Sequence, residues 1–185
     1  NTPVWHNQSE PLLPDTRAQI IDPRTAYQIV SLLEGVVQYG TGKSVSVVGK
    51  PLAGKTGTTN DSKDTWFIGF SPDLACGVFV GFDNPRTLGR YEQGATVAAP
   101  IFRDFMKGAL ENEPATPFRV PPGIDLVSVN RITGDPAPPG APTTILEAFK
   151  AGTEPGIAVT DETNNLSAQG KGPATDVDQG TGGLY

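Results

Sequence analysis

The sequence predicts an α+β fold: a portion of antiparallel sheet with helices packed on it, followed by a disordered C-terminal tail. Two stretches carry apolar residues at spacings of three and four, which is typical of amphipathic helices. Between them, two short runs alternate like strands and are separated by a brief turn, which favours an antiparallel hairpin. From residue 156 onward the chain is polar and rich in Gly, and it has too little apolar content to offset chain entropy.

The first helix is expected to begin at Asp22-Pro23, because Asp caps free N–H groups and Pro fits the first helical position. Its apolar stripe consists of Ala26, Ile29, Val30, Leu33 and Val37. Gly40-Thr41-Gly42 is expected to end the helix, since glycine accepts the left-handed cap conformation. The valine-rich residues 45–48 then predict a short strand or extended piece.

Residues 64–70 and 75–82 predict the hairpin, and Ser71-Pro72-Asp73 predicts its turn. Along the first strand, the side chains of Trp66, Ile68 and Phe70 are expected on one face, and Phe67 and Gly69 on the other. The glycines of both strands are expected to leave room for a helix to approach one face closely. These glycines are Gly69, Gly77 and Gly81.

Residues 98–110 predict that helix, with Pro100 tolerated in its first turn. Its apolar stripe consists of Ile101, Phe102, Phe105, Met106 and Ala109. Beyond residue 110 the chain becomes Pro-rich, and residues 124–133 predict one strand and 144–150 one or two helical turns. We therefore expect a sheet-and-helix portion at residues 1–113, a small irregular extension at 114–157 and a disordered acidic tail at 158–185.

Composition excludes several classes of function. The net charge of −6 lies entirely in residues 111–185, so no nucleic-acid binding is expected, because that requires a cationic surface. The single cysteine, Cys76, lies in an apolar run and is interpreted as a small buried hydrophobe. The single histidine, His6, offers neither a Ser-His-Asp triad nor a histidine cluster, and no metal or cofactor is expected. No apolar run reaches the ~18 residues that a membrane-spanning helix needs.

The residues that indicate chemistry are Lys55-Thr56-Gly57-Thr58, which lead into an apolar strand. Acyl transfer to a peptide that ends in a carboxylate needs a cation, hydroxyl donors and backbone N–H groups directed at the developing oxyanion. If this stretch is a strand, Lys55 and Gly57 point to one face and Thr56 and Thr58 to the other. Gly57 has no side chain, so a substrate backbone can lie directly against it.

The order of these motifs closely resembles the C-terminal part of the transpeptidase domain of class A penicillin-binding proteins, of the 1A type. The stretches that carry the resemblance are Gly40-Thr41-Gly42, residues 53–60, residues 64–70, residues 77–81, Pro122-Gly123-Ile124 and residues 147–156. The resemblance covers roughly residues 20–157, and the tail adds nothing to it. It implies that the sheet belongs to a penicillin-binding, serine transpeptidase fold.

The resemblance implies a membrane-anchored, bifunctional cell-wall synthase on the periplasmic side of the bacterial inner membrane, whose anchor and glycosyltransferase lie upstream. Its transpeptidase half attacks stem peptides through a serine acyl-enzyme, and β-lactam antibiotics trap that serine. Lys55 then supports proton transfer and binds the substrate carboxylate region, and the Thr58 N–H is one oxyanion donor. Thr56 and Thr58 supply carboxylate-binding hydroxyls, and Gly57 and Thr59 complete the substrate-binding set. Asp64 and Trp66 match the family pattern and are interpreted as structural.

One departure from the family is decisive for the interpretation: the chain contains no Ser-x-x-Lys, so the nucleophile must come from an upstream transpeptidase segment. Ser128-Val129-Asn130 matches the family's Ser-x-Asn motif, but it follows Lys55 rather than preceding it, and we interpret it as chance. The chain alone is therefore not expected to be active.

Two alternatives stay open at this point. Gly49-x4-Gly54-Lys55-Thr56 matches a phosphate-binding loop, although such a loop requires a helix to begin at the lysine, and residues 56–65 are poor helix formers. Pro51 would also remove one phosphate-binding N–H from the loop. The other alternative is a non-catalytic module for protein contacts.

Overall fold

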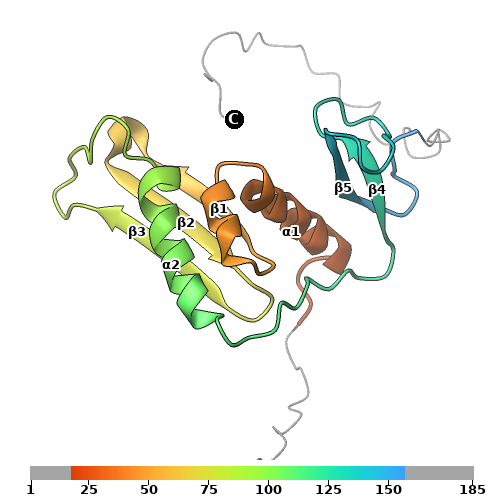
Figure 1. Ribbon diagram of the computed structural model, residues 1–185, viewed down its shortest axis with the longest axis horizontal. Coiled ribbons are helices and arrows are strands. Elements are labelled where there is room, and N and C mark those ends of the chain that lie inside the picture. The colour runs from red at the N-terminus through yellow and green to blue at the C-terminus, as the bar shows by residue number, and fades with distance from the viewer. Residues whose placement is uncertain (1–17, 157–185) are drawn as a thin grey trace, which may run out of the picture.

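The computed structural model describes residues 18–156, which form a three-stranded sheet, two main helices and a separate two-stranded sheet (Figure 1). The long elements are α1 (Pro23–Gln38), β1 (Ala53–Thr58), β2 (Asp64–Phe70), β3 (Ala75–Gly81), α2 (Ala99–Ala109), β4 (Ile124–Asn130) and β5 (Thr144–Lys150). Three short helical segments complete them, namely η1 (Lys43–Val48), η2 (Asn60–Ser62) and η3 (Gly94–Ala98). The predicted α+β class is confirmed.

The main sheet has the order β1-β2-β3 with both pairs antiparallel, so β1 and β3 are edge strands. The predicted hairpin is β2–β3, and its turn is held by the Ser71 N–H, which donates to the Leu74 carbonyl at 2.8 Å. The Ser71 hydroxyl accepts the Leu74 N–H at 3.0 Å, which is the local bonding that makes serine a good turn residue.

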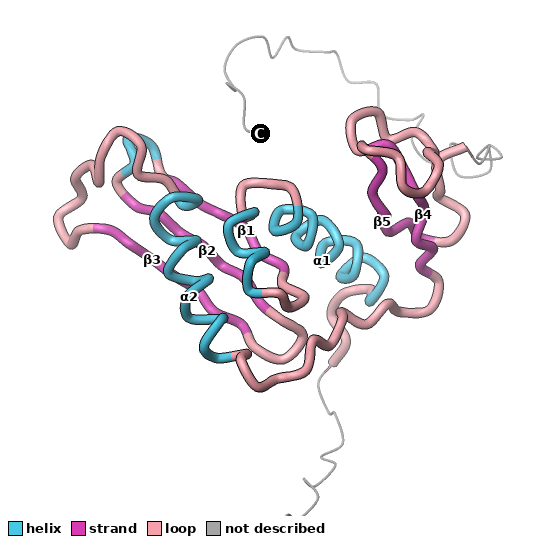
Figure 2. The backbone as a smooth tube through the Cα atoms, viewed as in Figure 1, coloured by secondary structure: helices cyan, strands magenta, loops and turns pink. Residues whose placement is uncertain are grey.

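Helix α2 covers one face of this sheet, which we call the inner face (Figure 2). The residues of β2 alternate, so Thr65, Phe67 and Gly69 are buried on the inner face. Phe67 and Phe102 are both fully buried, and their ring centroids lie 4.6 Å apart. A Cβ at Gly69 would lie 2.8 Å from the Phe102 ring, so this glycine permits the close helix approach that the sequence predicts.

The prediction for the other two glycines was wrong. A Cβ at Gly77 or Gly81 would meet side chains of β2 and β3 and not a helix. The predicted stripe of α2 was also too wide: Phe102 and Met106 are buried, whereas Ile101 and Phe105 are 49% and 50% exposed. The buried contact of the helix with the sheet is narrow, and Ile101 and Phe105 lie outside it.

Helix α1 begins as predicted, because the Asp22 carboxylate accepts the Arg24 N–H at 2.8 Å and Pro23 is the first helical residue. Hydrogen bonds from the Arg24 side chain and N–H hold the pKa of the Asp22 carboxyl well below its usual range. The helix ends before Gly40, but the reason predicted for this glycine was wrong, since its φ is not positive. A Cβ at Gly40 would lie 2.9 Å from the Val36 Cα, so the position needs space and not a left-handed backbone.

Two short elements differ from the predictions. Residues 45–48 belong to the 3-10 helix η1 and not to a strand, because the backbone turns from Gly42 and buries Val45 in the core. Residues 144–150 form the strand β5 and not helical turns, because they pair along their whole length with β4. In both cases the local pattern of a short apolar run fits either structure, and packing or pairing decides.

The β4–β5 sheet lies on the opposite side of α1 from the main sheet (Figure 1). The Gln28 side chain donates to the Ala148 carbonyl at 3.1 Å, and the Lys150 ammonium donates to the Thr25 hydroxyl at 2.7 Å. The guanidinium of Arg131 lies 5.5 Å from the Tyr39 ring centroid. The extension is therefore more ordered than predicted, while the boundaries at 113 and 157 stay predictions.

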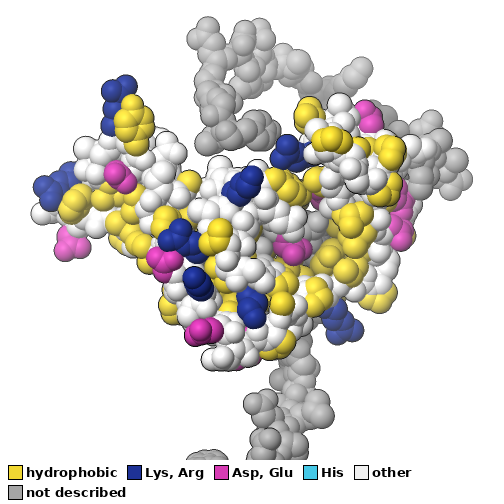
Figure 3. Space-filling view, viewed as in Figure 1, with side chains coloured by type: hydrophobic (Ala, Val, Ile, Leu, Met, Phe, Trp, Pro, Cys, Tyr) yellow, Lys and Arg dark blue, Asp and Glu magenta, His cyan; other side chains and the backbone are white. Residues whose placement is uncertain are grey.

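Some predictions fall on residues that are not described: His6 and the acidic tail at 158–185 lie outside 18–156. Cys76 is only partly buried, against the core, and this burial raises the pKa of its thiol. On the face seen in Figure 3, positive and negative side chains are interspersed over the main sheet and α2. No helix within residues 18–156 is long and apolar enough to cross a membrane.

Candidate active site

The predicted site residues Lys55, Thr56, Gly57 and Thr58 form the C-terminal end of β1, and Thr59 directly follows the strand. Lys55 pairs with Ile68 and Gly57 with Trp66, which places them on the outer face of the sheet. Thr56 and Thr58 pair with Phe67 and Thr65 on the inner face. The extended conformation and the alternation of side chains are as predicted.

The backbone of β1 presents some of its polar groups to the sheet and others to a free edge. The Thr59 N–H donates to the Asp64 carbonyl at 3.0 Å, so Thr59 and Asp64 are a pair whose main-chain groups face each other across the ladder. Such pairs alternate along antiparallel strands, and the residues between them direct both N–H and C=O away from the partner. The main-chain groups of Thr56 and Thr58 therefore point away from β2, toward the free edge of β1.

The lysine of the motif reaches the same edge. The Lys55 ammonium donates to the Thr56 carbonyl, at 3.2 Å, and that carbonyl is one of the groups that point away from β2. Since an ammonium has three donors, two stay available beyond this bond. The edge of β1 thus brings a cation and the Thr58 N–H to one side of the strand, which is the pairing of groups that acyl transfer needs.

The two hydroxyls on the inner face are held by residues distant in sequence. The Thr56 hydroxyl lies 2.9 Å from the hydroxyl of Thr41, which follows α1, and either group can donate. The Thr58 hydroxyl accepts the N–H of Gly94, at 3.0 Å. Each contact fixes a side chain of the motif against a segment that follows α1 or begins η3, and we call these segments, together with the helices, the helical layer.

Thr59 has a different role from the other motif residues in this structure. Its hydroxyl accepts the Asp64 N–H at 2.8 Å and also lies 3.3 Å from the Asp64 carbonyl. Both bonds close the turn between β1 and β2. Substrate binding by this hydroxyl would have to compete with the turn, so the Thr59 side chain is better suited to shaping the end of the strand.

The phosphate-loop alternative disagrees with this geometry. Such a loop places the lysine at the start of a helix whose free N–H groups bind phosphate. Here Lys55 and Thr56 lie within a strand that pairs along its length with β2. The residues before it do not form the required strand either, because residues 43–48 are helical.

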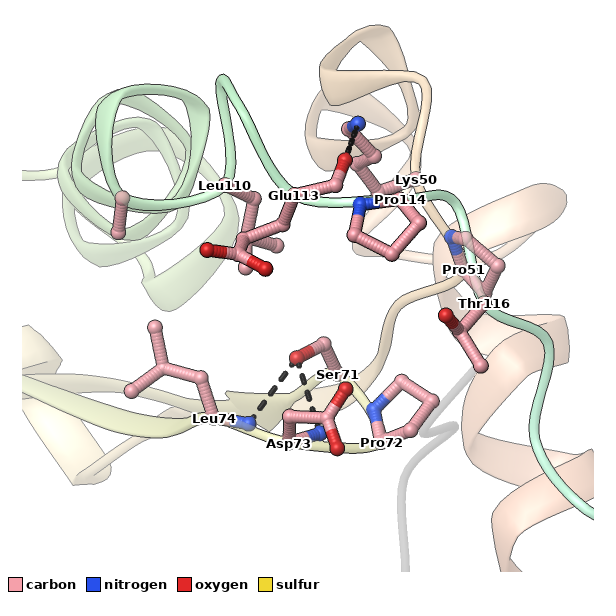
Figure 4. Close-up of a pocket in the computed structure, with 11 residues that line it drawn as sticks. Lys50, Pro51, Ser71, Pro72, Asp73, Leu74, Leu110, Glu113, Pro114 and Thr116 are labelled. Atoms are coloured by element: carbon pink, nitrogen blue, oxygen red, sulfur yellow. Dashed lines mark hydrogen bonds between the residues drawn. The ribbon is translucent and has the colours of Figure 1, made fainter. Parts of the chain in front are cut away.

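A cavity of about 330 Å³ lies at the far end of the sheet from the motif (Figure 4). It is lined by the segment before β1, the turn between β2 and β3, and the end of α2 with the chain that follows. Ser71, Asp73, Leu74, Leu110 and Glu113 are among these residues. Because β1 begins at this end and reaches Thr58 at the other, this cavity is not the predicted substrate site.

The remaining sequence matches are separate from the motif. Ser128-Val129-Asn130 lies in β4, and the Asn130 side-chain oxygen accepts the Ile132 N–H at 2.8 Å within its own turn. That placement agrees with its interpretation as chance. Within residues 18–156 no group of three or more His, Cys, Asp or Glu side chains is arranged to hold a metal ion.

Sequence reasoning missed two residues that support the motif, Thr41 and Gly94. Thr41 was interpreted as part of a helix end and of the family resemblance, but not as a contact of the motif, and Gly94 was not singled out. They lie 15 and 36 positions from the threonines they contact. No local pattern carries that information, since both contacts depend on how the helical layer folds back over β1.

Comparison with known proteins agrees with the fold and with the family resemblance. The family description "Penicillin binding protein transpeptidase domain" matches residues 12–107, which is more than half of the chain. The chain belongs to the transpeptidase domain family of the penicillin-binding proteins.

Among individual proteins, the chain is similar to those named penicillin-binding protein 1A. It is 52% identical over 131 residues to that of Rickettsia bellii (strain RML369-C), and 47% identical over 138 residues to that of Pseudomonas aeruginosa PAO1. These matches cover 71% and 74% of this chain but only 16% and 17% of the relatives. The crystal structure of penicillin-binding protein 1A from Haemophilus influenzae matches with a TM-score of 0.63 and 36% identity, covering 73% of this chain and 21% of that one.

Proposed function

We propose that this chain supplies the Lys-Thr-Gly-Thr wall of a peptidoglycan D,D-transpeptidase that crosslinks stem peptides through a serine acyl-enzyme and is acylated by β-lactams. The observation that carries the proposal is the free edge of β1, where the Lys55 ammonium and the main-chain groups of Thr58 lie on one side of the strand. Membership of the transpeptidase domain family supports this function over a non-catalytic module for protein contacts.

Each motif residue has a role in the proposed reaction. The Lys55 ammonium supports proton transfer at the serine and attracts the substrate carboxylate. The Thr58 N–H donates to the oxyanion that develops when the serine attacks, and the serine's own N–H is the second donor. The hydroxyls of Thr56 and Thr58 bind the carboxylate, and Gly57 lets the substrate backbone approach β1.

The serine nucleophile is proposed to come from the preceding part of the same protein, because the chain has no Ser-x-x-Lys and spans about a sixth of the length of the curated relatives it matches. The outer face of the sheet supports a covering segment, since Trp66, Ile68 and Phe79 are apolar and between 41% and 58% exposed. Adjacent apolar residues this exposed are typical of a contact surface.

We propose that the whole protein is a bifunctional, membrane-anchored synthase at the periplasmic side of the inner membrane.

Acylation by a fluorescent penicillin tests the proposal. In the complete protein, Lys55→Ala is expected to slow acylation by roughly 10²–10⁴-fold, the usual contribution of a group that assists proton transfer. Lys43→Ala is the matched control, since Lys43 is an exposed lysine on η1, outside the motif, and it should leave the rate unchanged. An unchanged rate in Lys55→Ala would refute the assigned role.

A further inference from the structure

Gly94 contacts the motif through its main chain. It is the first residue of η3, it is buried, and its N–H donates to the Thr58 hydroxyl at 3.0 Å. The first N–H groups of a helical segment have no partner within the segment, so the threonine hydroxyl satisfies a donor that would otherwise be unpaired. The contact therefore benefits both η3 and Thr58.

The position has no room for a side chain unless η3 shifts away from the strands. A Cβ at residue 94 would lie 2.6 Å from the Gly57 carbonyl oxygen, 2.6 Å from the Trp66 carbonyl oxygen and 3.0 Å from the Gly57 nitrogen. All three atoms belong to the backbone of β1 and β2, so none can rotate away. The φ of Gly94 is not positive, so the requirement is for space alone. Any larger residue would push η3 off the strands and break the bond to Thr58.

The direction of this bond determines what the Thr58 hydroxyl can do next. A hydroxyl has one hydrogen to donate and two lone pairs, and an amide N–H can only donate. Gly94 therefore uses a lone pair of Thr58 and leaves its single hydrogen for another acceptor. An ionised carboxylate is acceptor-only, and a hydroxyl that already accepts a bond is polarised to donate more strongly.

We propose that Gly94 is a positioning residue of the acyl-transfer site: its main-chain N–H holds the Thr58 hydroxyl as a donor to the substrate carboxylate. This inference rests on the proposed function, which assigns carboxylate binding to Thr58. It adds that Gly94, in the helical layer on the inner face, determines whether the Thr58 hydroxyl on the edge strand donates or accepts a hydrogen bond.

The test compares two probes in the complete protein, a penicillin with a free carboxylate and its methyl ester. Gly94→Ala is expected to slow acylation by the free acid roughly tenfold, as for the loss of one hydrogen bond to a charged group. Acylation by the ester should change much less, because the ester carries no ionised carboxylate. Gly108→Ala is the matched control, since a Cβ there meets nothing within 4 Å.

A double-mutant cycle separates positioning from a structural role. Thr58→Val should lose the same factor as Gly94→Ala with the free acid, and Gly94→Ala should add no further loss in the Thr58→Val background. Thr58→Ser keeps the hydroxyl and should keep the rate. Losses that multiply, or that are equal for acid and ester, would overturn the inference and leave Gly94 a structural residue.

Two further results keep the inference testable and separate from the proposed function. If Gly94→Ala fails to fold, amide hydrogen exchange at Gly94 decides: it should be faster in Thr58→Val than in the wild type and unchanged in Thr58→Ser. Equal exchange in all three would overturn the inference. If Lys55→Ala and Thr58→Val both leave penicillin acylation unchanged, the proposed function itself has failed.

Discussion

Truncation of Phe102 tests how the sheet that carries the motif is supported. The Phe102 ring is fully buried, with its centroid 4.6 Å from that of Phe67 on β2. Phe102→Ala removes this ring from a packed interior, and such changes cost about 3–5 kcal/mol of unfolding free energy. The aromatic pair accounts for about 0.5–1.5 kcal/mol of that loss beyond the buried area.

Phe105→Ala provides a matched control, because it makes the same deletion one turn along α2 where the ring is 50% exposed. Half of the full burial energy of a phenylalanine side chain is about 0.8–1.5 kcal/mol. Denaturant unfolding of the transpeptidase domain measures both variants. Equal losses for the two phenylalanines, or a loss below about 1 kcal/mol for Phe102→Ala, would refute the packing of α2 on the inner face.

Three other substitutions have defined outcomes. The Thr65 hydroxyl is buried with no hydrogen-bond partner within residues 18–156. Thr65→Val should therefore raise the unfolding free energy by about 1 kcal/mol. A lower unfolding free energy than in the wild type, measured by denaturant unfolding, would contradict this. Burial raises the pKa of the Glu34 carboxyl above its ordinary value of 4.5. The stability that the protonated carboxyl contributes is therefore complete below pH 4.5 and is lost as the pH rises through the higher pKa of the folded state. Glu34→Gln should therefore raise Tm at pH 7 and give no gain near pH 4; a constant gain across this range would show that the charge is not the cause. Gln28→Ala removes the bond to the Ala148 carbonyl and should cost about 1 kcal/mol, with faster amide exchange in β5 than in β2. Equal exchange changes in the two sheets would argue against the docking of β5 on α1.

The sequence was sufficient for the elements whose pattern is long and unambiguous. The hairpin β2–β3 and helix α2 follow from periods of two and of three to four, and Asp22-Pro23 marks the start of α1. It was not sufficient where a short apolar run fits two structures. Residues 45–48 turn helical because Val45 enters the core, and residues 144–150 become a strand because β4 pairs with them. Both outcomes depend on partners distant in the chain.

The candidate site, like the fold, could be predicted from the sequence only in part. The proposed type of chemistry rests on four adjacent residues, since Lys55 and the Thr58 N–H reach one edge through the alternation of a single strand. The state of the motif hydroxyls does not follow from those residues. Thr56 contacts Thr41 and Thr58 contacts Gly94, so each hydroxyl is bonded to a segment that packs on the inner face. A substitution at either support changes no motif residue, yet it removes a hydrogen-bond partner of a motif hydroxyl.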